Sequence, residues 1–313
     1  MLKDKRVLVV GSSNMDLSMN VCRIPSPGET VIDDGGVSYT PGGKGANAAI
    51  AFRKLGAESI FCTRLGADLH GQKLYSYFKE QQLNTSYIKV DKTNPTGFAA
   101  IMKDTEGQNR IIYYPGANLK IAPDSIAEAF TTHPDALYVG FESSFDTALY
   151  ASRIASANAV PIFVDAAPAD KNYPLESLPP VEVFSPNETE TLEYTGILPI
   201  GAESSLRAAH ALFRRVKCKY IVIKQGARGV FIYDGKHYSM VPSYRPDKIV
   251  DTVAAGDAFT AAMTLKYLEC GNIIEACRYG AAAGAIVVSR VGASVAMPTE
   301  REIVEFIAKR PIQ

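Results

Sequence analysis

The sequence predicts an α/β fold, in which a mostly parallel central sheet is flanked by helices on both faces and a small second β-sheet stands off it. One observation is that short β-branched runs, such as VLVVGSS at 7–13 and ALYVG at 136–140, alternate with longer segments of helical period. Another is that two stretches, about 16–40 and 97–118, break this alternation with strand-like residues and glycine turns. The chain has 313 residues, 47% of them apolar, which suits a single domain over 1–313.

The elements of the main body follow from two periodicities. Apolar runs bounded by turn residues predict core strands at 7–13, 59–66, 136–140, 161–167, 181–187, 220–226 and 229–235. Apolar residues spaced three and four apart predict helices at 45–57, 70–82, 146–157, 188–195, 204–217, 255–270, 272–289 and 299–309. In sheets of this kind ligands bind at the carboxyl ends of the strands.

The two stretches that break the alternation predict the strands of the small sheet. ETVIDDGGVSYTPGG, within and just beyond 16–40, is strand-like around a glycine turn, and 97–118 reads as a hairpin around TEGQN. Both lie between the first and the middle strands of the core. We expect this small sheet to serve as a substrate lid, a dimer surface, or both.

Bulk composition argues against several classes of partner. The formal net charge is zero, so bulk electrostatics favours neither nucleic acid nor an anionic membrane. Five scattered cysteines without a C-x-x-C pair make a disulfide framework or a zinc site improbable. The N-terminus has no secretory signal pattern, and the apolar run AAAGAIVV at 281–288 is far shorter than a membrane span. A cytoplasmic protein is the expectation.

Four glycine-rich loops, GSSNMD, PGGKGAN, SPNETE and KQGARG, carry polar side chains where an open sheet would bind ligands. Each also has an ordinary explanation as a turn, a helix cap or a hairpin. No P-loop and no G-x-G-x-x-G after the first strand is present. The candidate binding residues, together with one acid that follows the strand at 136–140, are Asn14, Asp16, Gly42, Gly43, Lys44, Asn47, Glu142, Asn187, Glu190, Lys224, Gly226 and Gly229.

The segment DTVAAGDAFTAA places Asp257 at the start of a predicted helix, and two explanations compete. Asp257 could cap the helix, because an acid there satisfies free amides and favours the helix dipole. Alternatively the amides could receive an anion from a ligand while Asp257 performs proton chemistry beside it.

Two segments resemble the signatures of the ribokinase-like sugar kinases. They are PGGKGANAAIAFRKLGA at 41–57 and DTVAAGDAFTAAM at 251–263, with PNETE at 186–190 between them. The order of the three segments is highly specific, and the resemblance covers essentially the whole chain. It implies a sheet between helices with a β lid, and ATP-dependent phosphorylation of a small sugar. Within the family it favours D-ribose, phosphorylated at the 5-hydroxyl.

The resemblance also assigns roles, and it implies the ligands ATP, magnesium and potassium and a homodimer formed through the lid. Asp257 corresponds to the general base, and the amides of Ala254, Ala255, Gly256 and Asp257 to an anion hole. The sugar-binding positions correspond to Asn14, Asp16, Gly42, Gly43, Lys44, Asn47, Glu142 and Asp257. Asn187, Glu190, Lys224, Gly226 and Gly229 correspond to nucleotide-binding positions, with Glu190 holding magnesium through water. The potassium site corresponds to Asp251, Val253, Val287, Arg290 and Gly292.

The sequence departs from the family pattern at four places. Lys224 replaces a small hydroxyl residue, and Asp165 stands where asparagine is frequent. Ala281 replaces a larger residue against adenine, and the bulk of Met15, between Asn14 and Asp16, bears on which pentose fits. The alternatives are a kinase for another small sugar, such as deoxyribose, or for a nucleoside, and a non-catalytic sugar- or nucleotide-binding regulator.

Overall fold

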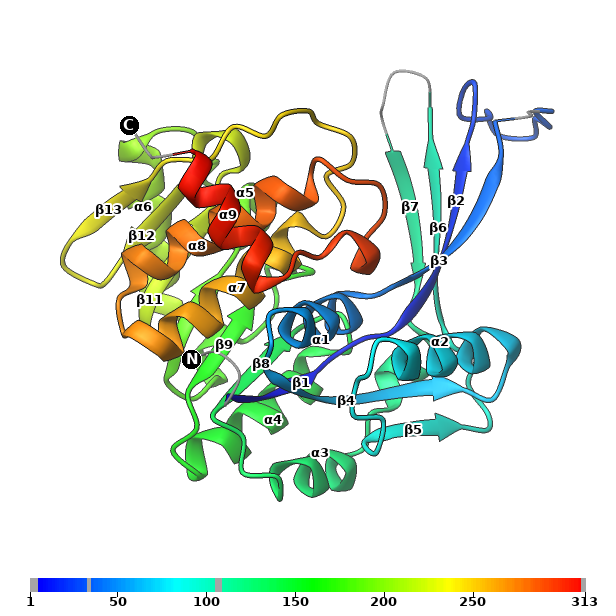
Figure 1. Ribbon diagram of the computed structural model, residues 1–313, viewed down its shortest axis with the longest axis horizontal. Helices are drawn as coiled ribbons and strands as arrows, with labels where there is room; N and C mark the ends of the chain where they lie inside the picture. The colour runs from blue at the N-terminus through cyan, green and yellow to red at the C-terminus, as the bar shows by residue number, and fades with distance from the viewer. Residues whose placement is uncertain (1–4, 33–34, 105–108, 311–313) are drawn as a thin grey trace.

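A nine-stranded sheet forms the centre of the molecule in the computed structural model, which describes residues 5–32, 35–104 and 109–310 (Figure 1). The strand order is β13-β12-β11-β10-β9-β8-β1-β4-β5, and all neighbours are parallel except β11–β12 and β12–β13. The strands are β1 (Arg6–Val10), β4 (Glu58–Gly66), β5 (Ile88–Asp91), β8 (Ala136–Gly140), β9 (Ile162–Asp165), β10 (Val181–Ser185), β11 (Cys218–Lys224), β12 (Val230–Tyr233) and β13 (Tyr238–Val241).

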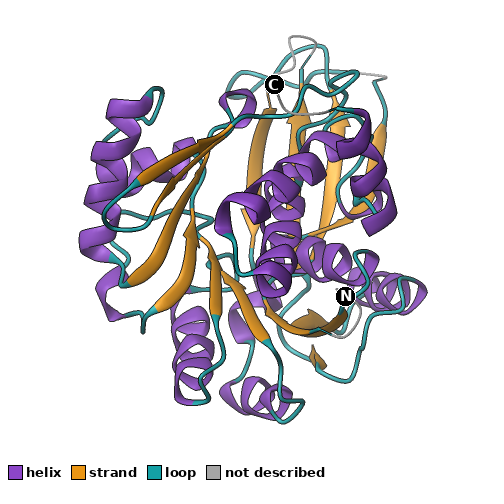
Figure 2. Ribbon diagram, turned by 60° about the vertical axis from the view of Figure 1, so that its left-hand side comes forward, coloured by secondary structure: helices purple, strands orange, loops and turns teal. Residues whose placement is uncertain are grey.

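Helices cover both faces of this sheet (Figure 2). One face packs against α1 (Lys44–Lys54), α2 (Leu69–Glu80), α7 (Ala255–Cys270), α8 (Ile273–Val287) and α9 (Glu300–Lys309). The other packs against α3 (Pro123–Phe130), α4 (Phe145–Ala157), α5 (Glu188–Thr195) and α6 (Ala202–Arg215). Val7 and Val9 of β1 join the first layer, whereas Leu8 and Val10 join the second. A strand buried on both faces reads as a continuous apolar run, which explains VLVV.

A second sheet of four strands rises away from the main body (Figure 1). Its order is β3-β2-β6-β7, formed by β2 (Asn14–Asn20), β3 (Val37–Gly42), β6 (Gly97–Lys103) and β7 (Asn109–Tyr114). β2 and β6 are parallel, and the two outer pairs are antiparallel. Asp16 lies opposite Thr40 and Ala99, so these three residues share one face of the small sheet. The strand that carries Asp16, β2, follows the carboxyl end of β1 in the chain.

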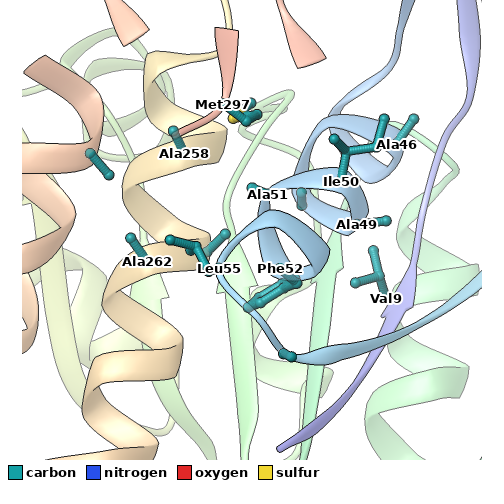
Figure 3. Close-up of a cluster of buried hydrophobic side chains, with 14 of the residues drawn as sticks. Val9, Ala46, Ala49, Ile50, Ala51, Phe52, Leu55, Ala258, Ala262 and Met297 are labelled. Carbon is teal, nitrogen blue, oxygen red and sulfur yellow. The ribbon is translucent and has the colours of Figure 1, made fainter. Parts of the chain in front are cut away.

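The close packing of α1 against α7 brings distant parts of the chain together at the base of the four-stranded sheet, which is called the lid below after its predicted role. Figure 3 shows Ala258 and Ala262 of α7 beside Ala51 of α1 and Leu55, which follows α1, with Val9 of β1 on the far side of α1. The small alanine side chains permit two helix backbones to approach closely. The first turns of α1 and α7 therefore lie side by side at the carboxyl end of the sheet.

The predicted architecture is confirmed, including the small second sheet. The predicted helices at 188–195 and 255–270 have the observed bounds, and the other predicted helices begin and end within a few residues of the observed ones. β5, α3 and β13 were not predicted, and residues 105–108, which make up most of the predicted TEGQN turn, lie outside the described residues. Among the described residues, no helix is long and apolar enough to span a bilayer.

Candidate active site

The loop before α1 lies directly against the end of β1, and glycines make this possible. The Ala46 amide donates to the Ser12 carbonyl at 2.9 Å. Gly43 has a φ of +93°, and a Cβ there would come within 2.9 Å of backbone atoms of Ser12, Ser13 and Asn14. A residue with a side chain would be both strained and obstructed there. The PGGKGAN loop therefore delivers Lys44 and Asn47 to the carboxyl end of the sheet, where the sequence predicted them.

Asp257 does not cap its helix. α7 begins after Ala254, which has a left-handed backbone (φ 62°), and no side chain caps it. The buried Asp257 carboxylate instead accepts a hydrogen bond from Asn47 Nδ2 at 2.8 Å and lies 3.6 Å from Lys44 Nζ. The prediction that the Asp257 side chain satisfies the free amides is therefore wrong, although its place in the first turn still favours the helix dipole. Among the described residues no hydrogen bond reaches the amides of Gly256 and Asp257, so this helix end is open to an anion.

Asp16 lies in β2 of the small sheet, in an environment that opposes ionisation of its carboxyl group. Burial, together with the Glu142 and Asp257 carboxylates, raises the pKa of Asp16 to about 7. Its Oδ1 atom is buried and has no hydrogen-bond partner among the described residues. Gly42 stands so close that any side chain there would collide with the carboxylate. An unsatisfied buried acceptor of this kind suits a hydroxyl donor from a ligand.

Glu142 follows β8 and is hydrogen-bonded to the loop after β1, to the start of α1 and to the small sheet. Its Oε2 atom accepts a hydrogen bond from the Ser12 hydroxyl and another from the Lys44 amide at 2.9 Å. The Tyr113 hydroxyl of the lid donates to the Glu142 carbonyl oxygen at 3.1 Å. The predicted acid is thus held beside the start of α1, within reach of the same ligand as Asp16 and Asp257.

Lys44 is surrounded by acids. Burial opposes its protonation, but the carboxylates of four acids outweigh this effect and raise the pKa of Lys44. In decreasing order of influence these acids are Asp257, Asp165, Glu190 and Glu142. Lys44 therefore remains an ammonium group. It interacts through its charge with acids of both predicted sites: Asp257 and Glu142 of the sugar site, and Glu190 of the nucleotide site.

Sequence reasoning missed the residues that hold the predicted ones. Asn118 accepts from the Ser13 amide at 2.9 Å and donates to Asn14 Oδ1 at 2.7 Å. It also donates to the Tyr113 hydroxyl at 3.2 Å. The signal was available, because Asn118 ends the PGAN segment that closes the hairpin stretch. Asn14 is buried and oriented by this network, as expected of a residue that must present its amide in one direction.

The nucleotide-side candidates form two neighbouring structures. Asn187 caps α5 in a reciprocal capping box, in which its side chain accepts from the Glu190 amide at 2.8 Å and the Glu190 carboxylate accepts from the Asn187 amide at 2.7 Å. The ordinary explanation, a helix cap, is therefore confirmed. Burial raises the pKa of Glu190, against the opposing influence of Lys224 and Lys44. Both Glu190 carboxylate oxygens accept a hydrogen bond from Asn187, an arrangement that suits the predicted binding of magnesium through water.

The loop KQGARG is the turn of the hairpin between β11 and β12, and its residues 226–228 are exposed, whereas Gln225 and Gly229 are buried. Gly226 has a φ of +53° with nothing within 4 Å of its missing side chain, and Gly229 has a φ of +94°. The Lys224 amide donates to the Pro186 carbonyl at 2.9 Å, which ties this loop to the PNETE segment. The two predicted nucleotide loops are therefore adjacent, and a glycine turn beside them leaves room for a ligand.

The predicted potassium loop lies against the end of α8. The amides of Val250 and Asp251 donate to the Val288 carbonyl at 2.8 and 3.3 Å, and Asp251 Oδ1 accepts from the Val253 amide at 3.1 Å. Val287 ends α8, and its carbonyl accepts from the Arg290 amide at 3.0 Å. Gly292 follows with a φ of +92°. All five predicted residues thus belong to two contacting segments, and carbonyl oxygens suit a weakly hydrated monovalent cation.

Two of the sequence departures lie away from the sugar acids. Met15 is buried in the core cluster that includes α1 and α7, and it lies on the opposite face of β2 from Asp16. The expectation that its bulk bears on the choice of pentose is therefore not supported by its position. Ala281 is half-buried in α8 against the same apolar layer. Among the described residues no three His, Cys, Asp or Glu side chains gather as a metal site.

The assembled site combines hydroxyl acceptors with an anion-binding helix end. Asp16, Glu142 and Asp257 supply carboxylates, and Asn14 and Asn47 supply amides, which together suit a small polyol. The open amides at the start of α7 lie within one helical turn of Asp257. The arrangement can hold an alcohol beside a carboxylate and a phosphoryl group beside a helix end, which is what transfer of a phosphoryl group to a hydroxyl requires.

Comparison with known proteins agrees with this chemistry. Residues 4–300 match the pfkB family carbohydrate kinases. The chain is 32% identical over 306 residues to a ribokinase of Haemophilus influenzae, covering 97% of this chain and 98% of that protein. It is 25% identical to a deoxyribokinase of Salmonella typhimurium, covering 96% and 98%.

The chain also matches a longer relative and a solved structure. It is 32% identical to a bifunctional ribokinase/ribose-5-phosphate isomerase A of Fructilactobacillus sanfranciscensis, covering 97% of this chain but 56% of that protein. The structure of Arabidopsis thaliana ribokinase complexed with ribose and ATP superposes with a TM-score of 0.85 at 28% identity, covering 97% and 98% of the two chains. Sequence, fold and site geometry therefore agree that the chain belongs to the pfkB family of carbohydrate kinases.

Proposed function

We propose that this protein transfers the γ-phosphoryl group of ATP to the 5-hydroxyl of D-ribose. The observation that carries the proposal is the orientation of Asp257, which is buried at the start of α7 yet leaves the helix amides open and points toward Asn47 and Lys44. A carboxylate that only stabilised the helix would bond to those amides. The similarity to ribokinases over nearly the whole chain supports ribose as the substrate.

On the sugar side, hydroxyl groups donate to the carboxylates of the site, among them the Oδ1 atom of Asp16, which has no hydrogen-bond partner among the described residues. Asp16 and Glu142 accept from the ring hydroxyls, and Asn14, Asn47 and Lys44 fix the orientation of the sugar. The network of Asn118 and Tyr113 holds Asn14 and the Glu142 backbone in place. Orientation by groups that are already fixed lowers the entropy lost on reaching the transition state.

At the reacting centre, Asp257 accepts the proton of the 5-hydroxyl as its oxygen bonds to the γ-phosphorus. The bond from the γ-phosphorus to the bridging oxygen breaks, and ADP leaves with that oxygen. The amides of Ala254, Ala255, Gly256 and Asp257 receive the negative charge of the transferring group, without any reorganisation of side chains. Asn47 keeps Asp257 directed at the hydroxyl through its 2.8 Å hydrogen bond.

The ligands ATP, magnesium and potassium belong to this proposal. Gly226, Gly229 and Lys224 lie along the nucleotide, and Asn187 and Glu190 hold magnesium through water, where it would screen phosphate charge. Potassium would be held by Asp251 and by the carbonyls of Val253, Val287, Arg290 and Gly292, behind the loop that presents the anion hole. The closely similar relatives include a deoxyribokinase, so phosphorylation of deoxyribose is the second candidate.

Two measurements test the proposal. A coupled assay for ADP release with ribose, deoxyribose and a panel of nucleosides should show the highest kcat/KM for ribose. Asp257→Asn retains an oxygen that can accept from Asn47, so it should keep sugar binding but lose roughly 10²- to 10⁴-fold in turnover. A variant that keeps more than about a tenth of wild-type turnover would refute the base assignment. Absence of ATP turnover with every sugar would favour the non-catalytic regulator.

A further inference from the structure

Lys224 and Asp165 form a buried ion pair between two strand ends. Asp165 ends β9 and is 1% exposed, and the Lys224 side chain at the end of β11 is 12% exposed. Lys224 Nζ lies 3.2 and 3.3 Å from the two Asp165 carboxylate oxygens. Burial opposes ionisation of Asp165, but Lys224 and Lys44 outweigh it and lower the pKa of that carboxyl. The lysine side chain thus reaches across the end of β10, which separates the two strands.

The pair is aimed at the anion-binding end of α7. Lys224 Nζ lies 3.5 Å from Thr260 Oγ1, and a Cβ placed on Gly256 would lie 3.8 Å from the same nitrogen. Thr260 Oγ1 is in turn within 3.2 Å of Asp165 Oδ2 and 3.0 Å of the Gly256 carbonyl. The Tyr138 hydroxyl donates to Asp165 Oδ2 at 3.3 Å. Asp165 is thus held by three side chains, whereas Lys224 is held by Asp165 and Thr260.

The free energy of folding does not by itself explain why this buried ion pair is present. Removing two charges from water costs several kcal/mol per ion, and their mutual attraction often does no more than offset that cost. The surrounding site is also rich in acids, because Asp165, Glu190, Asp257 and Glu142 all act on Lys44. These four carboxylates would repel a polyphosphate that enters the site, so its binding needs a cation near the helix end. Lys224 supplies one beside Gly256.

We propose that Lys224 is a catalytic residue that contacts the γ-phosphoryl group at the start of α7, and that Asp165 is the positioning residue that directs it there. This inference rests on the proposed kinase function. An ammonium group beside the open amides adds a full charge to the partial charge of the helix end, where negative charge gathers during transfer. Asp165 and Thr260 keep the lysine from turning toward Glu190, whose carboxylate also feels its charge.

The test compares nucleotides that do and do not carry a γ-phosphoryl group. Calorimetric titration with magnesium and either ADP or β,γ-imido-ATP is performed on the intact protein and on Lys224→Met. The variant should bind β,γ-imido-ATP about 10- to 100-fold more weakly, as expected for loss of a charged hydrogen bond, while its affinity for ADP changes by less than about threefold. Turnover should fall by at least about 10-fold, with the KM for the sugar unchanged.

Two further variants exclude a structural explanation. Lys219→Met removes a lysine from the amino-terminal part of the same strand, where it is paired with Glu182, and should change neither nucleotide affinity. Asp165→Asn combined with Lys224→Met leaves a neutral pair of similar size, so it should fold and should repeat the selective loss for β,γ-imido-ATP. Asp165→Asn alone should lower kcat with little change in affinity for ADP.

Equal weakening of ADP and β,γ-imido-ATP in the lysine variants, or no weakening of either, would overturn the inference and leave the pair a structural one. The outcome is separable from that of the proposed function. A protein that binds β,γ-imido-ATP through Lys224 but phosphorylates no sugar would refute the kinase proposal while supporting the phosphate contact.

Discussion

The titration of Asp16 is linked to the stability of the fold. Its pKa is raised from 3.8 to about 7 by burial and by two neighbouring acids, so the folded state resists its ionisation. The folded state therefore binds this proton more tightly than the unfolded state does. Stability from this group is present below pH 3.8 and is lost as pH rises toward the folded-state pKa.

Asp16→Asn should remove this pH dependence. Between about pH 5.5 and about pH 8 the wild-type free energy of unfolding should fall by about 2 kcal/mol more than that of the variant. Urea denaturation at several pH values, without ligand, measures the difference.

Asp91 provides a contrast, because hydrogen bonds from the Asn94 and Thr93 amides lower its pKa. Asp91→Asn should lose stability at neutral pH, and its difference from wild type should shrink on acidification. Parallel pH profiles for Asp16→Asn and wild type would contradict the assignment.

At the residue scale the sequence predicted chemistry better than it predicted contacts. Asn47 and Asp257 were both predicted, but no local pattern shows that residues 210 positions apart meet in a hydrogen bond. The supporting residues Asn118 and Ser12 were missed for the same reason, since their role depends on where the lid returns to the core. The pairing of Lys224 with Asp165 was also missed. Each was noted separately as a departure, and only the structure brings them within 3.2 Å.

At the scale of elements, periodicity was sufficient where a strand or helix is buried and insufficient at the margins. β5 and β13 are the two edge strands of the large sheet, and each has only four residues. Short edge strands bury few side chains, so their sequences carry little alternation. α3 begins with Pro123 in its first turn, and it was overlooked although it is no shorter than the predicted α5. The lid strands were predicted because they interrupt an otherwise regular alternation.

The entry to α7 is the element on which the potassium proposal depends. Residues 250–253 are fixed by the Val288 carbonyl on one side and lead into Ala254, whose φ of 62° is strained for alanine. A cation held by carbonyls of the two segments would rigidify this entry and so present the open amides of Gly256 and Asp257 in fixed positions. Turnover should rise several-fold when sodium or a bulky organic cation is replaced by potassium at constant ionic strength.

Two variants separate the ion from the local turn. Asp251→Ala removes both the carboxylate and the acceptor for the Val253 amide, so it should abolish the rise and leave a low basal rate. Asp251→Asn keeps an acceptor for that amide and removes only the charge. It should reduce the response to potassium while changing the basal rate less than Asp251→Ala does. Equal rates in all three salts for the wild-type protein would refute the potassium site.

At the scale of the whole molecule, the small sheet has a face on the side of Asp16, here called the ligand face because the proposed sugar would bind there, and an opposite face that the described residues cover only in part. Asp16, Thr40, Ala99 and Tyr113 share the ligand face by register. The opposite face, here called the outer lid face, includes the exposed side chains of Val37, Tyr39, Ile112 and Tyr114. His70 of α2 stacks on Tyr39 and approaches Phe98 at the base of this face. The remaining apolar surface is the kind that subunits bury.

We expect the outer lid face to pair with its copy in a second molecule and give a dimer. β3 and β7 are also unpaired edges of the lid sheet, and proteins normally cover such edges. Ile112, which is 67% exposed and lies opposite Ala100 on the edge strand β7, is the residue of the outer lid face to change. Ile112→Lys should convert the dimer to a monomer at micromolar concentration, measured by light scattering with and without ribose. Val304→Lys, a matched change on the exposed side of α9, should leave the dimer intact.

Because a lid excludes water from the reacting phosphoryl group, the monomeric variant should also hydrolyse more ATP per sugar phosphorylated. A wild-type protein that is monomeric in both conditions would contradict the shared lid and leave the assignment of Asp257 unaffected.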